Sequence, residues 1–424
     1  MNPTSVPGAR PADGRAMPVD HLRAFITVLV VAHHAVLAYH PYGPAAPGES
    51  FGAAPMWWRA FPVLDAAKFP GSDLLVTLND TFFMMLMFLV GGLFVARGVA
   101  RRGTAGYIGE RALRLGVPFL VSAALLAPLA YYPAYLQHGG TPGLSAYATA
   151  YAGLPVWPAG PAWFLWVLFV FGALAAIGLR AVPRAFDALA RVAGRLGERP
   201  ARFAAVFAAA CIAVYVPAAH VAGGMSWAEW GPFTVQTARI GLYALYFLVG
   251  IALGAHGVDR GLFAADGLLA QRWKRWTSIA PVFFFSFVAL LIAVFVALGK
   301  GETPSVALVD ATGAAFALSG VVTSLAVIAV FARFAHRWTG RAWASLGRNA
   351  FGIYLLHYAA ASWLQYALLG AAWPGAVKGL VVIAGALALS WAASAALMRV
   401  PGVARVIGDG GTVRRPVRAA ALPA

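Results

Sequence analysis

The sequence has few charged residues, fewer acidic than basic ones, and a single cysteine. Charged residues make up 11% of the 424 residues, and 15 Asp and Glu stand against 32 Lys and Arg. Soluble proteins usually carry about 25% charged residues. The lone Cys211 excludes an intramolecular disulfide and a thiolate-rich zinc site. Low charge excludes a soluble globular protein, and it argues against a nucleic-acid binder, which needs a polar surface to display basic residues.

Apolar residues are abundant instead, at 61% of the chain, and they gather in long runs. A helix of about 20 apolar residues crosses the hydrocarbon core of a bilayer. Because a helix satisfies its own backbone in lipid, the predicted fold class is all-α, a polytopic integral membrane protein. Ten spans are predicted, at 22–39, 74–96, 115–135, 163–179, 203–220, 240–256, 276–298, 306–332, 350–369 and 376–398.

The positions of the basic residues predict the orientation of these spans. With both termini in the cytoplasm, 27 of the 32 Lys and Arg lie on the inner side, as the positive-inside rule expects. We therefore predict a disordered cytoplasmic segment at 1–19, a ten-helix membrane domain at 20–399 and a basic cytoplasmic tail at 400–424. The five remaining basic residues lie on the outer side: Arg59, Lys68, Arg239, Lys300 and Lys378.

The first predicted span carries the most informative polar residues. Arg23 and His34 are eleven residues apart, roughly 20° beyond three helical turns, so they share one face, with His34 ~16 Å deeper in the membrane. The adjacent His33 points about 100° away. An ionisable side chain at mid-bilayer costs at least ~2.5 kcal/mol, so His34 and Arg23 are candidate catalytic residues. The alternative for His34 is a hydrogen bond between helices.

Further polar residues lie near both ends of the predicted bundle. Arg111 and Arg114 are neighbours on one helix edge at the inner side, where they either anchor the topology or bind a phosphorylated or carboxylated cytosolic ligand. Asp80 and Asp310 lie toward the outer side, where they either orient an acceptor hydroxyl or serve as a helix cap or partner of Arg239.

Two aromatic polar residues and two outer loops complete the candidates. Tyr354 and His357 are three residues apart and lie side by side on one helix, either in the site or in a buried hydrogen bond. The outer loops at 40–73 and 137–161 are rich in Gly, Pro and aromatic residues, as in an interfacial belt or a cover over substrate. No clustered His and Cys ligand set is present, so we expect no bound metal.

Several of these motifs resemble the acyltransferase-3 family, which comprises bacterial integral-membrane acyltransferases with a ten-helix core. One departure is a glycine, Gly91, where many relatives have a serine. Within the family, the chain is similar to the glucan biosynthesis protein C group. The motifs, in order, are Asp20-His-Leu-Arg23 with His34, Arg111-Ala-Leu-Arg114 with Pro118, Pro161-Ala-Trp163-Phe-Leu-Trp166, and Leu346-Gly-Arg-Asn-Ala-Phe-Gly-Ile-Tyr-Leu-Leu-His357.

The resemblance implies a reaction and a role for each pair. His34 is expected to be the catalytic histidine, supported by Arg23, while Arg111 and Arg114 help to bind an acyl-CoA donor. His33 beside it leaves open which imidazole acts. Such an enzyme, in the bacterial cytoplasmic membrane, moves an acetyl or succinyl group from cytosolic acyl-CoA to a hydroxyl of an extracytoplasmic glycan or small molecule, with acyl-CoA as co-substrate and no bound cofactor.

Two points of mechanism stay open from the sequence. His34 acts either as a general base or as a transient carrier of the acyl group, and both roles require a neutral imidazole. The alternative function is a proton-coupled transporter or flippase of a small polar or glycolipid substrate, because ionisable residues in the membrane also mark transport pathways. The absence of an obvious inverted repeat argues against it.

Overall fold

The computed structural model describes residues 17–408 except 45, 46 and 49. Most of the predicted disordered segment at 1–19 and residues 409–424 of the predicted tail lie outside this part. The helices are α1 (Met17–Val36), α2 (Ser72–Gly92), α3 (Val95–Arg111), α4 (Val117–Val121), α5 (Ala127–Gln137), α6 (Leu144–Ala152), α7 (Trp163–Ala181), α8 (Pro183–Gly197), α9 (Pro200–Ala222), α10 (Ile240–His256), α11 (Leu268–Gln271), α12 (Trp273–Gly299), α13 (Val306–Phe334), α14 (Arg341–Ala367), α15 (Gly375–Leu397) and α16 (Pro401–Ile407).

The long elements are helices, which confirms the predicted all-α polytopic class. Within the described residues, nine helices are long and apolar enough to cross a membrane. They match every predicted span except 350–369. That segment is part of α14, a 27-residue helix whose buried polar side chains, including Asn349, His357 and Gln365, lower its hydropathy. The count of ten spans and the cytoplasmic termini stay predictions.

The third predicted span is part of a longer helical stretch. Residues 95–137 form 43 continuous residues, with π-helical turns at Ala112–Gly116 and Ser122–Leu126 and a non-helical backbone at Gly103. The predicted span begins at residue 115 because charged residues up to Arg114 interrupt the apolar run, whereas the helix itself already begins at Val95. The π-helical turn after Arg111 widens the helix where the two candidate arginines lie.

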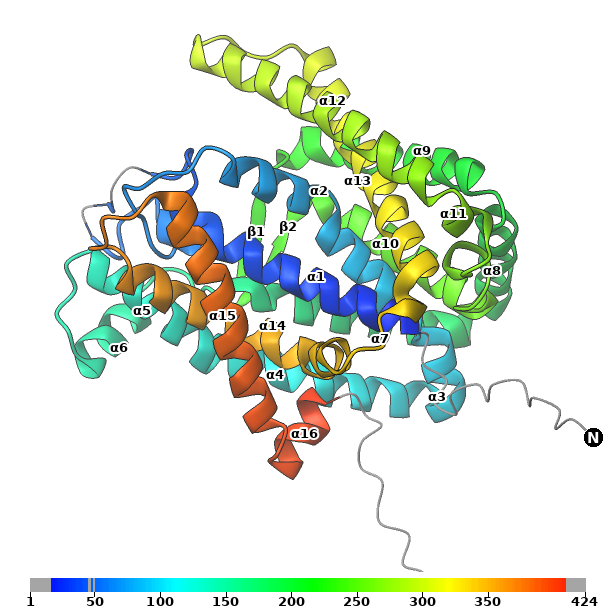
Figure 1. The fold of residues 1–424 in the computed structure, drawn as a ribbon, viewed down its shortest axis with the longest axis horizontal. Helices are drawn as coiled ribbons and strands as arrows, with labels where there is room; N and C mark the ends of the chain where they lie inside the picture. The colour runs from blue at the N-terminus through cyan, green and yellow to red at the C-terminus, as the bar shows by residue number, and fades with distance from the viewer. Residues whose placement is uncertain (1–16, 45–46, 49, 409–424) are drawn as a thin grey trace, which may run out of the picture.

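The first helix occupies the middle of the bundle. It contacts α2, α13, α14 and α15, and Figure 1 shows it running between them. Its carbonyls accept hydrogen bonds from neighbouring helices: Asn79 Nδ2 of α2 donates to Leu29 O (3.3 Å), and Gln365 Nε2 of α14 donates to His34 O and Ala35 O (2.9 and 3.0 Å). The backbone around His34 is therefore fixed from two sides.

Helices α2 and α10 cross at close range through small residues. A Cβ added at Gly250 would overlap the carbonyl of Leu89, so only glycine fits that crossing. Gly91 also lies close to a neighbouring helix, since a Cβ there would be 2.7 Å from Cδ1 of Leu168 in α7. The serine expected from the resemblance would require that leucine to move.

One short hairpin is the exception to the helical fold. Strands β1 (Trp227–Trp230) and β2 (Phe233–Gln236) pair antiparallel around a left-handed Gly231. The hairpin lies between α9 and α10, and it meets the loop that follows α1 through an ion pair between Glu229 and Arg59. We call the end of the bundle that carries residues 50–71, α5 and α6 the outer end, following the predicted orientation (Figure 1).

Three of the five predicted outer basic residues form ion pairs. Besides Arg59 with Glu229, Arg239 Nη2 lies 2.6 Å from Asp80 Oδ2, and Lys378 Nζ lies 2.7 Å from Asp65 Oδ2. The Asp65–Lys378 pair is the most deeply buried, with side chains 3% and 2% exposed. These three pairs tie loop segments of this end to the helices or to the hairpin.

Candidate active site

Two histidines from distant parts of the chain meet near the outer end of α1. His34 Nδ1 lies 3.1 Å from His357 Nε2 of α14, and the residues are 323 positions apart in sequence. His357 Nδ1 is 2.7 Å from the carbonyl oxygen of Tyr354, and His34 Nδ1 is 2.9 Å from that of Val30. The predicted neighbours Tyr354 and His357 are therefore linked to the predicted His34.

These contacts define where the protons lie. A carbonyl oxygen only accepts, so Nδ1 carries the hydrogen in both rings. A neutral His357 then has its lone pair on Nε2, where it accepts from His34 Nδ1–H. In a neutral His34 the remaining lone pair is on Nε2, which has no hydrogen. His34 thus keeps a basic nitrogen, while the partner histidine supports the opposite side of its ring.

Both rings are held in place by packing. His357 is fully buried, and the ring of Tyr358 meets the His34 ring edge-on with centroids 5.0 Å apart. The Tyr358 hydroxyl lies 3.5 Å from the hydroxyl of Tyr131, which donates to Arg59 O at 3.1 Å. The imidazole pair is therefore tied to the outer loop through two tyrosines.

His34 borders a cavity of about 570 Å³. Its wall combines aromatic side chains, such as Trp163, Trp227 and Tyr243, with the charged residues Asp80, Arg59 and Glu229. Cavities of this size, with a few polar groups among aromatic ones, are typical of small-ligand sites. Aromatic faces and hydrogen-bonding groups suit a hydroxylated ligand such as a sugar.

His33, next to His34 in the sequence, lines the same cavity but has different neighbours. The His33 ring stacks on Phe83 with centroids 5.2 Å apart, and among the described residues its buried Nδ1 has no hydrogen-bond partner. His34, in contrast, is oriented through Nδ1 by two acceptors. Only His34 has the orienting contact that a general base needs.

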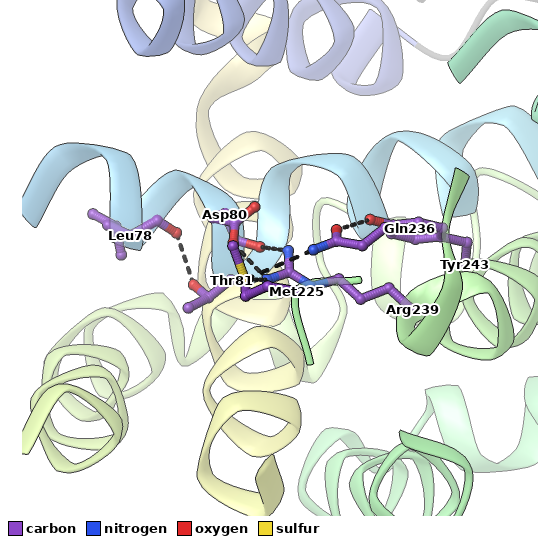
Figure 2. Close-up of polar contacts among 7 residues, drawn as sticks. All are labelled: Leu78, Asp80, Thr81, Met225, Gln236, Arg239 and Tyr243. Atoms are coloured by element: carbon purple, nitrogen blue, oxygen red, sulfur yellow. Dashed lines mark hydrogen bonds and ion pairs between the residues drawn. The ribbon is translucent and has the colours of Figure 1, made fainter. Parts of the chain in front are cut away.

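Asp80 lies on the cavity wall within a polar cluster (Figure 2). Arg239 reaches it from the segment after β2, and its guanidinium also lies over the ring of Phe316 at 4.6 Å. Close by, the Tyr243 hydroxyl donates to Gln236 Oε1 at 3.4 Å (Figure 2). The structure thus places Asp80 beside the cavity and in the ion pair with Arg239, which was one alternative for it, while its role toward an acceptor hydroxyl stays a prediction.

Other predicted site residues lie elsewhere. Asp310 is about 41% exposed and pairs with His220 of α9, outside the residues that line this cavity. Arg23 lies near the start of α1, far along the helix from His34, and its Nη1 is 3.6 Å from Asp20 Oδ1. Arg111 Nε donates to the Tyr107 hydroxyl at 3.0 Å, and Arg114 donates to Gly408 O and lies near Glu110. These arginines do not line the cavity.

Sequence reasoning missed several residues of this site. Tyr358 and Gln365 are seven positions apart in the ninth predicted span, so they lie on the same face of that helix. Two polar side chains on one face of an apolar span indicate a buried polar site, and this pattern could have been read from the sequence. Arg59 and Glu229 lie in outer segments whose approach depends on the packing of the whole bundle. No local pattern indicates that ion pair.

A helical membrane bundle with an oriented imidazole pair beside a cavity defines a multi-pass membrane protein with a histidine-centred candidate active site. A family model described as an acyltransferase domain matches residues 19–395. The chain therefore belongs to the acyltransferase-3 family and is a membrane acyltransferase. The predicted family is confirmed, whereas the likeness to the glucan biosynthesis protein C group stays a prediction. No curated protein and no solved structure matches the chain.

Proposed function

We propose that this acyltransferase moves an acetyl or succinyl group from cytosolic acyl-CoA to a hydroxyl of an extracytoplasmic glycan or related acceptor. The observation that carries the proposal is the His34–His357 contact, because it engages Nδ1 of His34, which lines the aromatic cavity, and leaves Nε2 of the same ring as the basic nitrogen. The acceptor occupies the cavity, and the donor thioester arrives from the inner side.

The chemistry follows from the proton positions. His34 Nε2 takes the proton of the acceptor hydroxyl as its oxygen attacks the thioester carbonyl. The tetrahedral intermediate then expels the CoA sulfur, which takes that proton and leaves as the thiol. His357 Nε2 accepts from His34 Nδ1–H throughout and stabilises the imidazolium that forms between the two steps.

The donor enters at the arginine-rich inner side in this proposal. Arg111 and Arg114 bind CoA phosphates, for which guanidinium groups are well suited. Arg23, on the face of α1 that carries His34, guides the thioester inward. In the structure Arg111 contacts a tyrosine hydroxyl, and Arg114 contacts a carbonyl and a carboxylate. A phosphate can replace each of these partners.

The test is acyl transfer from labelled acetyl-CoA or succinyl-CoA to envelope glycans in membranes that hold equal amounts of each variant. His34→Ala should lower the rate about 10²- to 10⁴-fold, the usual contribution of a general base. His33→Ala is the matched control, because it removes the neighbouring imidazole without the contact to His357. Unchanged transfer in His34→Ala, or loss only in His33→Ala, contradicts the assignment. Label retained on the wild-type protein without acceptor would favour the acyl-carrier route.

A further inference from the structure

A second hollow lies beside the histidine cavity at the outer end. It is a groove of about 1120 Å³ between α5, α6 and the tip of the β1–β2 hairpin. Figure 1 shows α6 folded back beside α5. Leu125 and Leu129, on its wall, are 66% and 49% exposed. In a membrane protein such exposed leucines face lipid, so the groove is open to the bilayer.

The groove wall is mainly apolar, and the polar atoms of four aromatic residues that line it are already hydrogen-bonded to backbone carbonyls. The hydroxyls of Tyr147 and Tyr151 donate to Pro128 O and Pro158 O, and the indole N–H groups of Trp157 and Trp363 donate to Ala123 O and Leu129 O. Burial raises the pKa of the Tyr147 and Tyr151 phenols, so both stay neutral. The wall therefore presents carbon, which suits a hydrocarbon chain.

One charged residue on the groove wall connects it to the active site. Glu229 lines both the groove and the histidine cavity, where it pairs with Arg59. Among the described residues the buried Nε of Arg59 has no hydrogen-bond partner, so its N–H group is left to donate to a further polar ligand. A molecule with its tail in the groove would place its polar end at Glu229 and Arg59, next to the cavity.

We infer that the groove between α5 and α6 binds the hydrocarbon tail of the acceptor, so that the acceptor is an amphiphile whose hydroxylated head enters the histidine cavity past Glu229. The inference rests on the proposed function and narrows its acceptor from any glycan to one carried on a lipid. The groove and the cavity share Glu229 in their walls, and the open side of the groove faces the layer in which such a lipid resides.

The test uses the full-length protein in lipid nanodiscs with a dodecyl maltoside that carries a diazirine on its chain. Photolabelling should concentrate on peptides of α5 and α6. Ala148→Trp places a large side chain from exposed α6 into the groove, and labelling at limiting probe should fall about fivefold or more, as expected from the roughly 1 kcal/mol or more that overfilling an apolar site costs. Ala146→Trp, about 200° around the same helix, is the matched control and should leave labelling unchanged.

Three outcomes overturn the inference: equal labelling in the two tryptophan variants, labelling spread evenly over lipid-facing helices such as α12, or equal labelling by a diazirine phosphatidylcholine, which would make the occupant an ordinary bilayer lipid. A parallel assay follows labelled acyl groups into solvent-extractable and aqueous products. The solvent-extractable product should be lost in Ala148→Trp and kept in Ala146→Trp. His34→Ala should abolish transfer and leave photolabelling intact, so failure of the proposed function is distinguished from failure of the groove.

Discussion

Replacing His357 with phenylalanine tests the proton positions derived for the histidine pair. The variant keeps a flat ring in a fully buried site but removes the Nε2 acceptor that lies 3.1 Å from His34 Nδ1. A hydrogen bond to a charged group contributes about 1.5–3 kcal/mol, which corresponds to roughly 10- to 150-fold in rate. The Val30 carbonyl, at 2.9 Å, still holds the same hydrogen. The loss should therefore be smaller than in His34→Ala.

The assay separates a positioning role from a packing role. The maximal rate of CoA release and product labelling should fall in His357→Phe, while the KM for acyl-CoA stays unchanged, because the lost contact matters when His34 becomes charged. Tyr358→Phe is the control, since it keeps the ring that packs on His34 and removes only a hydroxyl. Wild-type rates in His357→Phe, with His34→Ala inactive, would refute the reasoning and leave the contact between the imidazoles as packing alone.

Two further predictions concern the ion pairs and the inner arginines. Lys378→Met leaves Asp65 buried without its partner, so we expect a loss of about 3–5 kcal/mol in the free energy of unfolding. Thermal unfolding in detergent measures this loss, with Lys300→Met as the comparison. An unchanged unfolding temperature would mean that the ion pair contributes nothing to stability. The double variant Arg111→Ala/Arg114→Ala should raise the KM for acyl-CoA roughly tenfold or more, because it removes charge-assisted contacts to the phosphates. Arg341→Ala is the control. An unchanged KM would mean that both arginines only anchor the topology of the helix.

The helices could be predicted from the sequence because an apolar run of sufficient length has few alternatives in lipid. The α14 segment illustrates the limit, since its polar residues exclude it from the helices that are apolar enough to cross a membrane, although it contributes His357 to the site. The hairpin was missed, although Gly231-Pro232 between two short alternating segments is a turn signal. The apolar runs around it masked this local pattern.

The site was predictable only in part. Spacing along one helix places His34 on the face of Arg23, because helical periodicity is local. The contact with His357 is not local: it depends on how α1 and α14 cross, which no spacing within either helix determines. The same holds for Asp80 and Arg239, 159 positions apart, whose pairing could be offered as one alternative but not chosen.

The long separation of these contacts has a consequence for the synthesis of the protein. His34 is made early, its partner histidine follows 323 residues later, and Lys378 follows its aspartate by 313. Until α14 and α15 have inserted, a nascent chain contains His34 without the imidazole of His357 and Asp65 without the ammonium group of Lys378. The contact between the two imidazoles and the buried ion pair therefore form only when the last helices are in place.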